Sequence, residues 1–165
     1  MLFNEQLKKW NFKTTWTFVY LGLNFFEYEY ALKREDVIKY ACEIVAANDD
    51  NDEVLNLILA EDNTYEFNLI LKNLIEAENE DFCFEQRKWI VFVLNNVFEK
   101  LTVNLSAEDL FLLDDLWSYF EYPENYPRLK EQGPYSIGNK NDLAKIFPSH
   151  IKWIENEKMK LCTAA

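Results

Sequence analysis

Glycine and proline are scarce in this chain, and most of them gather in one stretch. Only 3 glycines and 4 prolines occur in 165 residues, whereas sheet proteins need both residues to punctuate their turns. Two of the glycines and three of the prolines fall within YPENYPRLKEQGPYSIGNK, residues 122–140. The scarcity favours uninterrupted helices, and the clustering predicts one long Pro/Gly loop near 122–140.

Apolar residues recur at helical spacing through most of the remaining sequence. We predict an all-α fold, a single compact domain of seven or eight helices, in which short connections make most neighbours antiparallel. Whether these stack as a globular bundle or a short solenoid-like layer is left open, although no repeat of fixed period is present. The predicted helices cover 3–11, 15–25, 34–47, 52–61, 64–77, 84–101, Ser106 to about Phe120, and 142–161.

Two segments need separate comment. In WIVFVL, residues 89–94, apolar side chains surround the whole helix, which is typical of a buried helix. We therefore expect Trp89, Val93 and Leu94 in the core. In FFEYEYAL, residues 25–32, apolar and acidic residues alternate, so this stretch is either a short extended piece or a tight connection between helices.

Residues 50–61 have the outline of a calcium loop, with carboxylates at Asp50, Asp52 and Glu61. An EF-hand loop needs an oxygen ligand at position 5 and glycine at position 6, but Val54 and Leu55 stand there. A helix that begins inside the segment fits better, with Asp50 as its cap. We therefore predict no metal site here.

Residues that could support catalysis are few. His150 is the sole histidine and shares an apolar stripe, so we expect it at the edge of the core with one nitrogen hydrogen-bonded. Cys42 lies on an apolar stripe of 34–47 and is expected to be buried. The adjacent acids Glu108 and Asp109, like Asp114 and Asp115, point about 100° apart on a helix and do not form a dyad. We predict no enzymatic activity and no cofactor.

Charge is concentrated in two segments. Residues 48–81 hold eleven acidic side chains against Lys72 alone, and residues 101–127 hold six acids and no base. The whole chain carries a net charge of −12. Such a field repels nucleic acid and anionic membranes and raises the encounter rate with basic partners. It also confers solubility, and that alternative remains open.

We therefore predict a protein partner with a basic surface, and neither nucleic acid nor a membrane as a partner. We also predict a cytoplasmic location, since neither a secretory h-region nor an apolar run of 18 residues occurs. The oligomeric state is left open. The candidate partner-binding residues are acids of the first charged segment: Asp49, Asp50, Asp52, Glu53, Glu61, Asp62, Glu76, Glu78, Glu80 and Asp81.

Several short motifs in their order suggest a family. Trp16, Gly22, KREDVIKYA at 33–41, RKWIVFVL at 87–94, and the Tyr-Pro pairs at 122–123 and 126–127 resemble a small bacterial family catalogued as domain of unknown function 2247. The resemblance implies a compact helical bacterial protein and brings no catalytic residues with it.

Two functional hypotheses follow. In the first, the protein is a non-catalytic binding module, by analogy an immunity-type inhibitor whose acidic surface docks on a basic toxin domain. In the second, it is a structural or regulatory helical subunit that self-associates or acts as a scaffold, and its acidity serves solubility.

Overall fold

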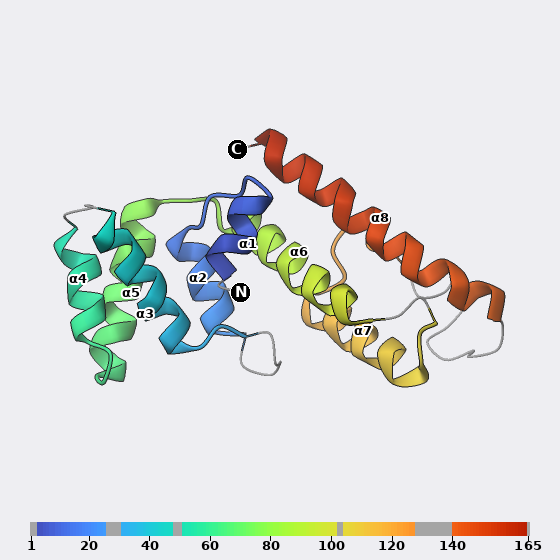
Figure 1. Ribbon diagram of the computed structural model, residues 1–165, viewed down its shortest axis with the longest axis horizontal. Helices are drawn as coiled ribbons and strands as arrows, with labels where there is room; N and C mark the ends of the chain where they lie inside the picture. Colours follow the sequence, from blue (N-terminus) through green and yellow to red (C-terminus); the bar gives the residue numbers. More distant parts are fainter. Residues whose placement is uncertain (1–2, 26–30, 48–50, 102–103, 128–139, 165) are drawn as a thin grey trace. The chain divides into compact units, whose positions relative to one another are not determined.

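The computed structural model describes residues 3–25, 31–47, 51–101, 104–127 and 140–164. Every regular element in these ranges is an α-helix, and they number eight (Figure 1). The helices are α1 (Phe3–Lys9), α2 (Trp16–Leu23), α3 (Arg34–Ala46), α4 (Asp52–Leu59), α5 (Thr64–Glu78), α6 (Phe82–Lys100), α7 (Ala107–Tyr119) and α8 (Lys140–Ala164). The all-α prediction is confirmed.

Several helix starts carry side-chain caps. The Thr15 hydroxyl accepts a hydrogen bond from the Phe18 amide at 3.0 Å, and the Ser106 hydroxyl accepts one from the Asp109 amide at 3.1 Å. The cap of α4 is Asn51, whose side chain accepts from the Glu53 amide at 3.0 Å. The prediction of Asp50 as this cap is therefore wrong by one residue, because the amide oxygen of Asn51 satisfies the same free N–H group.

The described residues fall into two compact units, one ending at Trp89 and one running from Ile90 to Ala164. This boundary lies inside α6. Of the predicted long loop, 122–140, residues 122–127 are non-helical, 128–139 lie outside the described residues, and residue 140 begins α8. Residues 26–30 of the FFEYEYAL stretch also lie outside the described residues. The prediction of one domain stays a prediction, and each unit is described by itself below.

In the first unit, four helices close a ring. Helix α3 packs against α4, α4 against α5, α5 against α2, and α2 against α3. The turn between α4 and α5 makes them antiparallel neighbours (Figure 1), and the Asn73 side chain donates to Glu53 at 2.9 Å across the pair. The inward faces of α3, α4 and α5 supply the buried residues Val37, Leu57 and Phe67.

Gly22 lets α2 approach the segment that follows it. A Cβ atom at this position would lie 2.6 Å from Leu32 Cγ and 2.8 Å from Trp89 Cζ3. The Gly22 carbonyl also accepts a hydrogen bond from the Leu32 amide at 2.9 Å. The Trp89 ring also packs edge to face against the Phe18 ring, with the two ring centroids 5.2 Å apart. Only glycine fits this close contact without displacing its neighbours.

The second unit has an aromatic core built by the end of α6 with α7 and α8. Val93, Leu94 and Trp117 are fully buried, and Trp117 meets Trp153 of α8 edge to face at 5.1 Å. The expected burial of Trp89, Val93 and Leu94 is confirmed. Within the ranges that the structure covers, no helix combines the length and apolar character that crossing a membrane requires.

Candidate partner-binding surface

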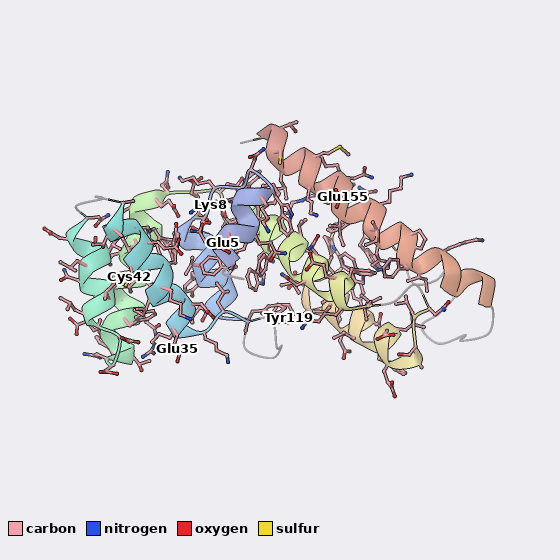
Figure 2. All side chains as sticks on the ribbon, in the orientation of Figure 1. Glu5, Lys8, Glu35, Cys42, Tyr119 and Glu155 are labelled. Atoms are coloured by element: carbon pink, nitrogen blue, oxygen red, sulfur yellow. The ribbon has the colours of Figure 1, made fainter. Side chains whose placement is uncertain are left out.

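Four of the predicted binding acids project from the α4–α5 hairpin into solvent. Asp52 begins α4, Glu61 and Asp62 lie in the turn, and Glu76 lies near the end of α5; all four are exposed. Figure 2 shows side chains that end in oxygen atoms along these two helices. Asp49 and Asp50 lie outside the described residues. Because residues 52–59 are helical and bury Val54, a calcium loop cannot form over 50–61.

Large apolar side chains are exposed on the same two helices. On α4, Leu55 is 45% and Leu59 75% exposed; on α5, Tyr65 is 80% and Leu69 48% exposed. Each pair is spaced i, i+4, so each forms a stripe on the outward side of its helix. We call these four residues together with Asp52, Glu61, Asp62 and Glu76 the hairpin surface. It combines apolar area with charge, as protein interfaces do.

The turn of the hairpin is held firmly by Arg34 from α3. Its guanidinium donates to the Glu61 carbonyl at 2.8 Å and to the Thr64 hydroxyl at 3.0 Å, and it lies 4.8 Å from the centre of the Phe67 ring. The Asn63 side chain also accepts from the Glu66 amide at 3.3 Å and so caps the start of α5. The exposed residues that flank the turn therefore stand on a fixed backbone.

The other four candidate acids form contacts that hold the first unit together. Glu53 accepts from Asn73, as described above, and Glu80 accepts from Lys13 at 2.8 Å. Asp81 caps α6 by accepting from the Cys83 amide at 2.9 Å. Glu78 accepts from the Trp16 amide at 2.7 Å, at the free N-terminal end of α2. We therefore leave these acids out of the hairpin surface.

Glu78 shows how burial and hydrogen bonding compete. Its partial burial raises the pKa of the carboxyl, while the N–H groups of Trp16 and Thr17 and the Lys13 ammonium act in the opposite direction. The same ammonium has a raised pKa, chiefly because it donates a hydrogen bond to Glu80. The hydrogen bonds of Glu78 and Glu80 thus link residues 13–17 to the chain at and just beyond the end of α5.

A buried ion pair extends this junction into the interior. The Lys88 ammonium donates to Glu85 Oε1 at 2.8 Å, with the two side chains 3% and 1% exposed. Lys88 also donates to the Lys13 carbonyl at 2.7 Å, and the Thr15 hydroxyl donates to Glu85 Oε2 at 2.6 Å. Both charges are therefore partnered. Sequence spacing alone suggests an exposed i, i+3 pair, so this network was not foreseen.

His150 is fully buried in the second unit, deeper than predicted, and both its nitrogens are hydrogen-bonded. Trp117 Nε1 donates to His150 Nε2 at 2.9 Å. The Nε2 atom must then be unprotonated, so Nδ1 carries the proton and donates to the Ile146 carbonyl at 2.8 Å. Burial lowers the pKa of this imidazole to about 4. The ring also stacks on Phe98 at 5.1 Å. Its role is structural, and it offers no base to a nucleophile.

The remaining reactive residues do not assemble into a site. Cys42, Cys83 and Cys162 all have exposed side chains, so the predicted burial of Cys42 is wrong. The buried stripe of α3 centres on Val37, Ile38 and Ala41, and the next residue points away from it. In the part of the chain that the structure describes, no group of three or more His, Cys, Asp and Glu side chains is placed to hold a metal ion.

The fold and surface define an all-helical protein with an acidic hairpin and hydrogen-bonded interior polar groups. Comparison with family models places it more closely: residues 4–158 match the model of DUF2247, described as an uncharacterized protein conserved in bacteria. The chain belongs to this family. No curated protein and no solved structure matches it.

Proposed function

We propose that this protein is a non-catalytic binding module that docks its hairpin surface on a partner protein with a basic surface. The observation that carries the proposal is the combination of exposed Asp52, Glu61, Asp62 and Glu76 with large exposed apolar side chains on one fixed hairpin. Acidic charge steers a basic partner into encounter, and apolar area buried on contact holds the complex together.

The most concrete form of this function is an immunity-type inhibitor. Such a protein neutralises a toxin domain, often basic, by covering it, and needs no catalytic group of its own. The concentration of eleven acids against one base in residues 48–81 supports this form. The alternative is a structural or regulatory subunit that self-associates through Leu59 and Tyr65, which are 75% and 80% exposed.

The test compares two variants with equal charge change. One neutralises Asp52, Glu61, Asp62 and Glu76 to Asn or Gln on the hairpin surface. The matched control neutralises the exposed acids Glu108, Asp115, Glu121 and Glu124 of the second unit. The partner is recovered from the native host by cross-linking to the wild-type protein, and association is followed by stopped flow at two salt concentrations.

We expect the hairpin variant to associate about 10 to 100 times more slowly at low salt, because field charges act mainly on the on-rate. The control should change much less, and the difference should shrink above about 0.15 M salt, where the Debye length is about 8 Å. Equal on-rates for both variants and wild type would reject the docking surface. Concentration-dependent dimerisation in sedimentation, lost on Leu59→Ala, would support the alternative.

A further inference from the structure

Tyr65 is the most exposed aromatic side chain of the hairpin surface. It lies in the first turn of α5 and is 80% exposed, and Leu69 follows one turn later on the same face. Three exposed carboxylates, those of Glu61, Asp62 and Glu66, lie within four residues of it in sequence. A ring face beside several carboxylates attracts a cation by two mechanisms, through the π-system and through charge-assisted hydrogen bonds.

The backbone that carries Tyr65 is already ordered. Arg34 binds the turn at the Glu61 carbonyl and the Thr64 hydroxyl, and Asn63 caps the start of α5. Binding at this point therefore does not have to order a loop, which removes one of the main costs of association. A tyrosine also loses little side-chain freedom on contact, because only two torsions are fixed.

The inner side of the same turn already holds a guanidinium in a comparable way. Arg34 lies 4.8 Å from the centre of the Phe67 ring while two of its nitrogens donate to oxygen atoms of the turn. A guanidinium is planar, so it stacks on a ring and still donates hydrogen bonds at its edge, whereas an ammonium is a compact, strongly hydrated point charge. The outward side also offers a ring, that of Tyr65, and oxygen acceptors, which here are carboxylates.

We propose that the turn of the hairpin recognises arginine: Tyr65 and the carboxylates of Glu61 and Asp62 receive an arginine side chain from a basic segment of the partner. This inference rests on the proposed function and deepens it, because it names the partner's contact residue. Lysine would meet the same charge but would gain less from the tyrosine ring.

The experiment uses two synthetic peptides, hexa-arginine and hexa-lysine, so that charge is held constant while the cation changes. Affinities are measured by fluorescence anisotropy at low salt for wild type, Tyr65→Ala, Tyr65→Phe and Tyr122→Ala. Tyr122 is the matched control, because it is 44% exposed and lies in the other acidic stretch, 101–127. Thermal melts confirm that each variant is folded, as expected for exposed positions.

We expect wild type to bind hexa-arginine about two to five times more tightly than hexa-lysine. Tyr65→Ala should abolish the difference, while Tyr65→Phe and Tyr122→Ala should keep it. A preference that is absent in wild type, or that survives in Tyr65→Ala, would overturn the inference.

The neutralised hairpin variant separates the two proposals. If it weakens both peptides more than the second-unit control does, while wild type shows no arginine preference, the hairpin surface stands and the arginine inference fails. If it weakens neither peptide more than that control, the hairpin surface itself is rejected.

Discussion

The two units bury titratable groups in different ways. The first unit encloses the Glu85–Lys88 ion pair, whose side chains are 1% and 3% exposed and whose charges meet each other, the Thr15 hydroxyl and the Lys13 carbonyl. The second unit encloses His150, whose neutral ring takes one hydrogen bond from Trp117 and gives one to Ile146. The first interior holds two charges that partner each other, whereas the second holds a neutral imidazole and a buried Glu157 whose partner, Lys160, is largely exposed.

This difference predicts which change should destabilise each unit. A buried charge is tolerated only while its partner is present, so the first unit should be sensitive to loss of one member of the pair. A buried neutral imidazole is tolerated only while it stays unprotonated, so the second unit should be sensitive to acid.

Replacing Lys88 with Met should destabilise the protein by about 3 to 5 kcal/mol, because it leaves the Glu85 carboxylate buried without its counter-ion. The free energy of unfolding, measured by urea denaturation, gives the value. A loss below about 1 kcal/mol would show that Glu85 reaches solvent when Lys88 is absent.

The double variant Lys88→Met with Glu85→Leu serves as its control. Replacing a buried pair by apolar residues of similar volume is often neutral, so most of the loss should be recovered. About 1 kcal/mol or more should remain lost, because the Thr15 hydroxyl and the Lys13 carbonyl each lose a partner.

Acid should act through His150. Its pKa is lowered to about 4 in the folded protein, against about 6.5 in the unfolded chain. The unfolded state therefore binds the proton first, so this contribution to stability is complete above about pH 6.5 and is lost as the pH falls towards 4. The full loss is about 3 kcal/mol.

The variant His150→Gln isolates that contribution from the carboxylates that titrate in the same range. Glutamine can accept from Trp117 and donate to Ile146, but it does not titrate. The difference in unfolding free energy between wild type and variant should shrink by about 3 kcal/mol from pH 6.5 to pH 4. A difference that is constant with pH would contradict the neutral, buried histidine.

Gly22→Ala tests how closely the apolar side chains of the first unit are packed. The new Cβ would lie 2.6 Å from Leu32 Cγ and 2.8 Å from the Trp89 ring. Overpacking of this kind costs about 1 to 3 kcal/mol, offset by about 1 kcal/mol of better helix propensity. We expect a net loss of about 0 to 2 kcal/mol in the free energy of unfolding measured by urea denaturation, and partial recovery when Leu32→Ala is added. A stabilised single variant would mean that the contact relaxes freely.

The helices could be predicted from sequence because their signals are local. Apolar spacing located α5 and α7 within a residue or two of their observed bounds. Charge counting also drew attention to the segment that forms the hairpin surface. A count of charges does not distinguish exposed acids from acids whose carboxylates accept hydrogen bonds from backbone N–H groups.

That separation depends on contacts between distant residues. Glu78 caps α2 across 62 positions, and Glu85 meets Thr15 across 70. Nothing in the local pattern around either glutamate announces these partners, and His150 likewise shows its second hydrogen bond only once α7 lies against α8. Burial of polar groups is decided by tertiary packing, so a one-dimensional pattern assigns it poorly.

The smallest expected effect belongs to an ion pair beside the buried one. Lys13 and Glu80 are 2.8 Å apart, but the lysine side chain is 67% exposed. Water already solvates such a charge, so removing its partner leaves no uncompensated buried ion, and the measured worth of exposed pairs is about 0 to 1 kcal/mol. Glu80→Gln should therefore change the unfolding free energy by less than about 1 kcal/mol, and less still in 1 M salt, where the Debye length is about 3 Å.

Urea denaturation beside Lys88→Met makes the comparison direct, since both variants break a lysine–glutamate pair of equal length in the same unit. If the two losses were equal, burial would not be what distinguishes these pairs, and the contrast between the two interiors would have to be explained by hydrogen-bond number instead.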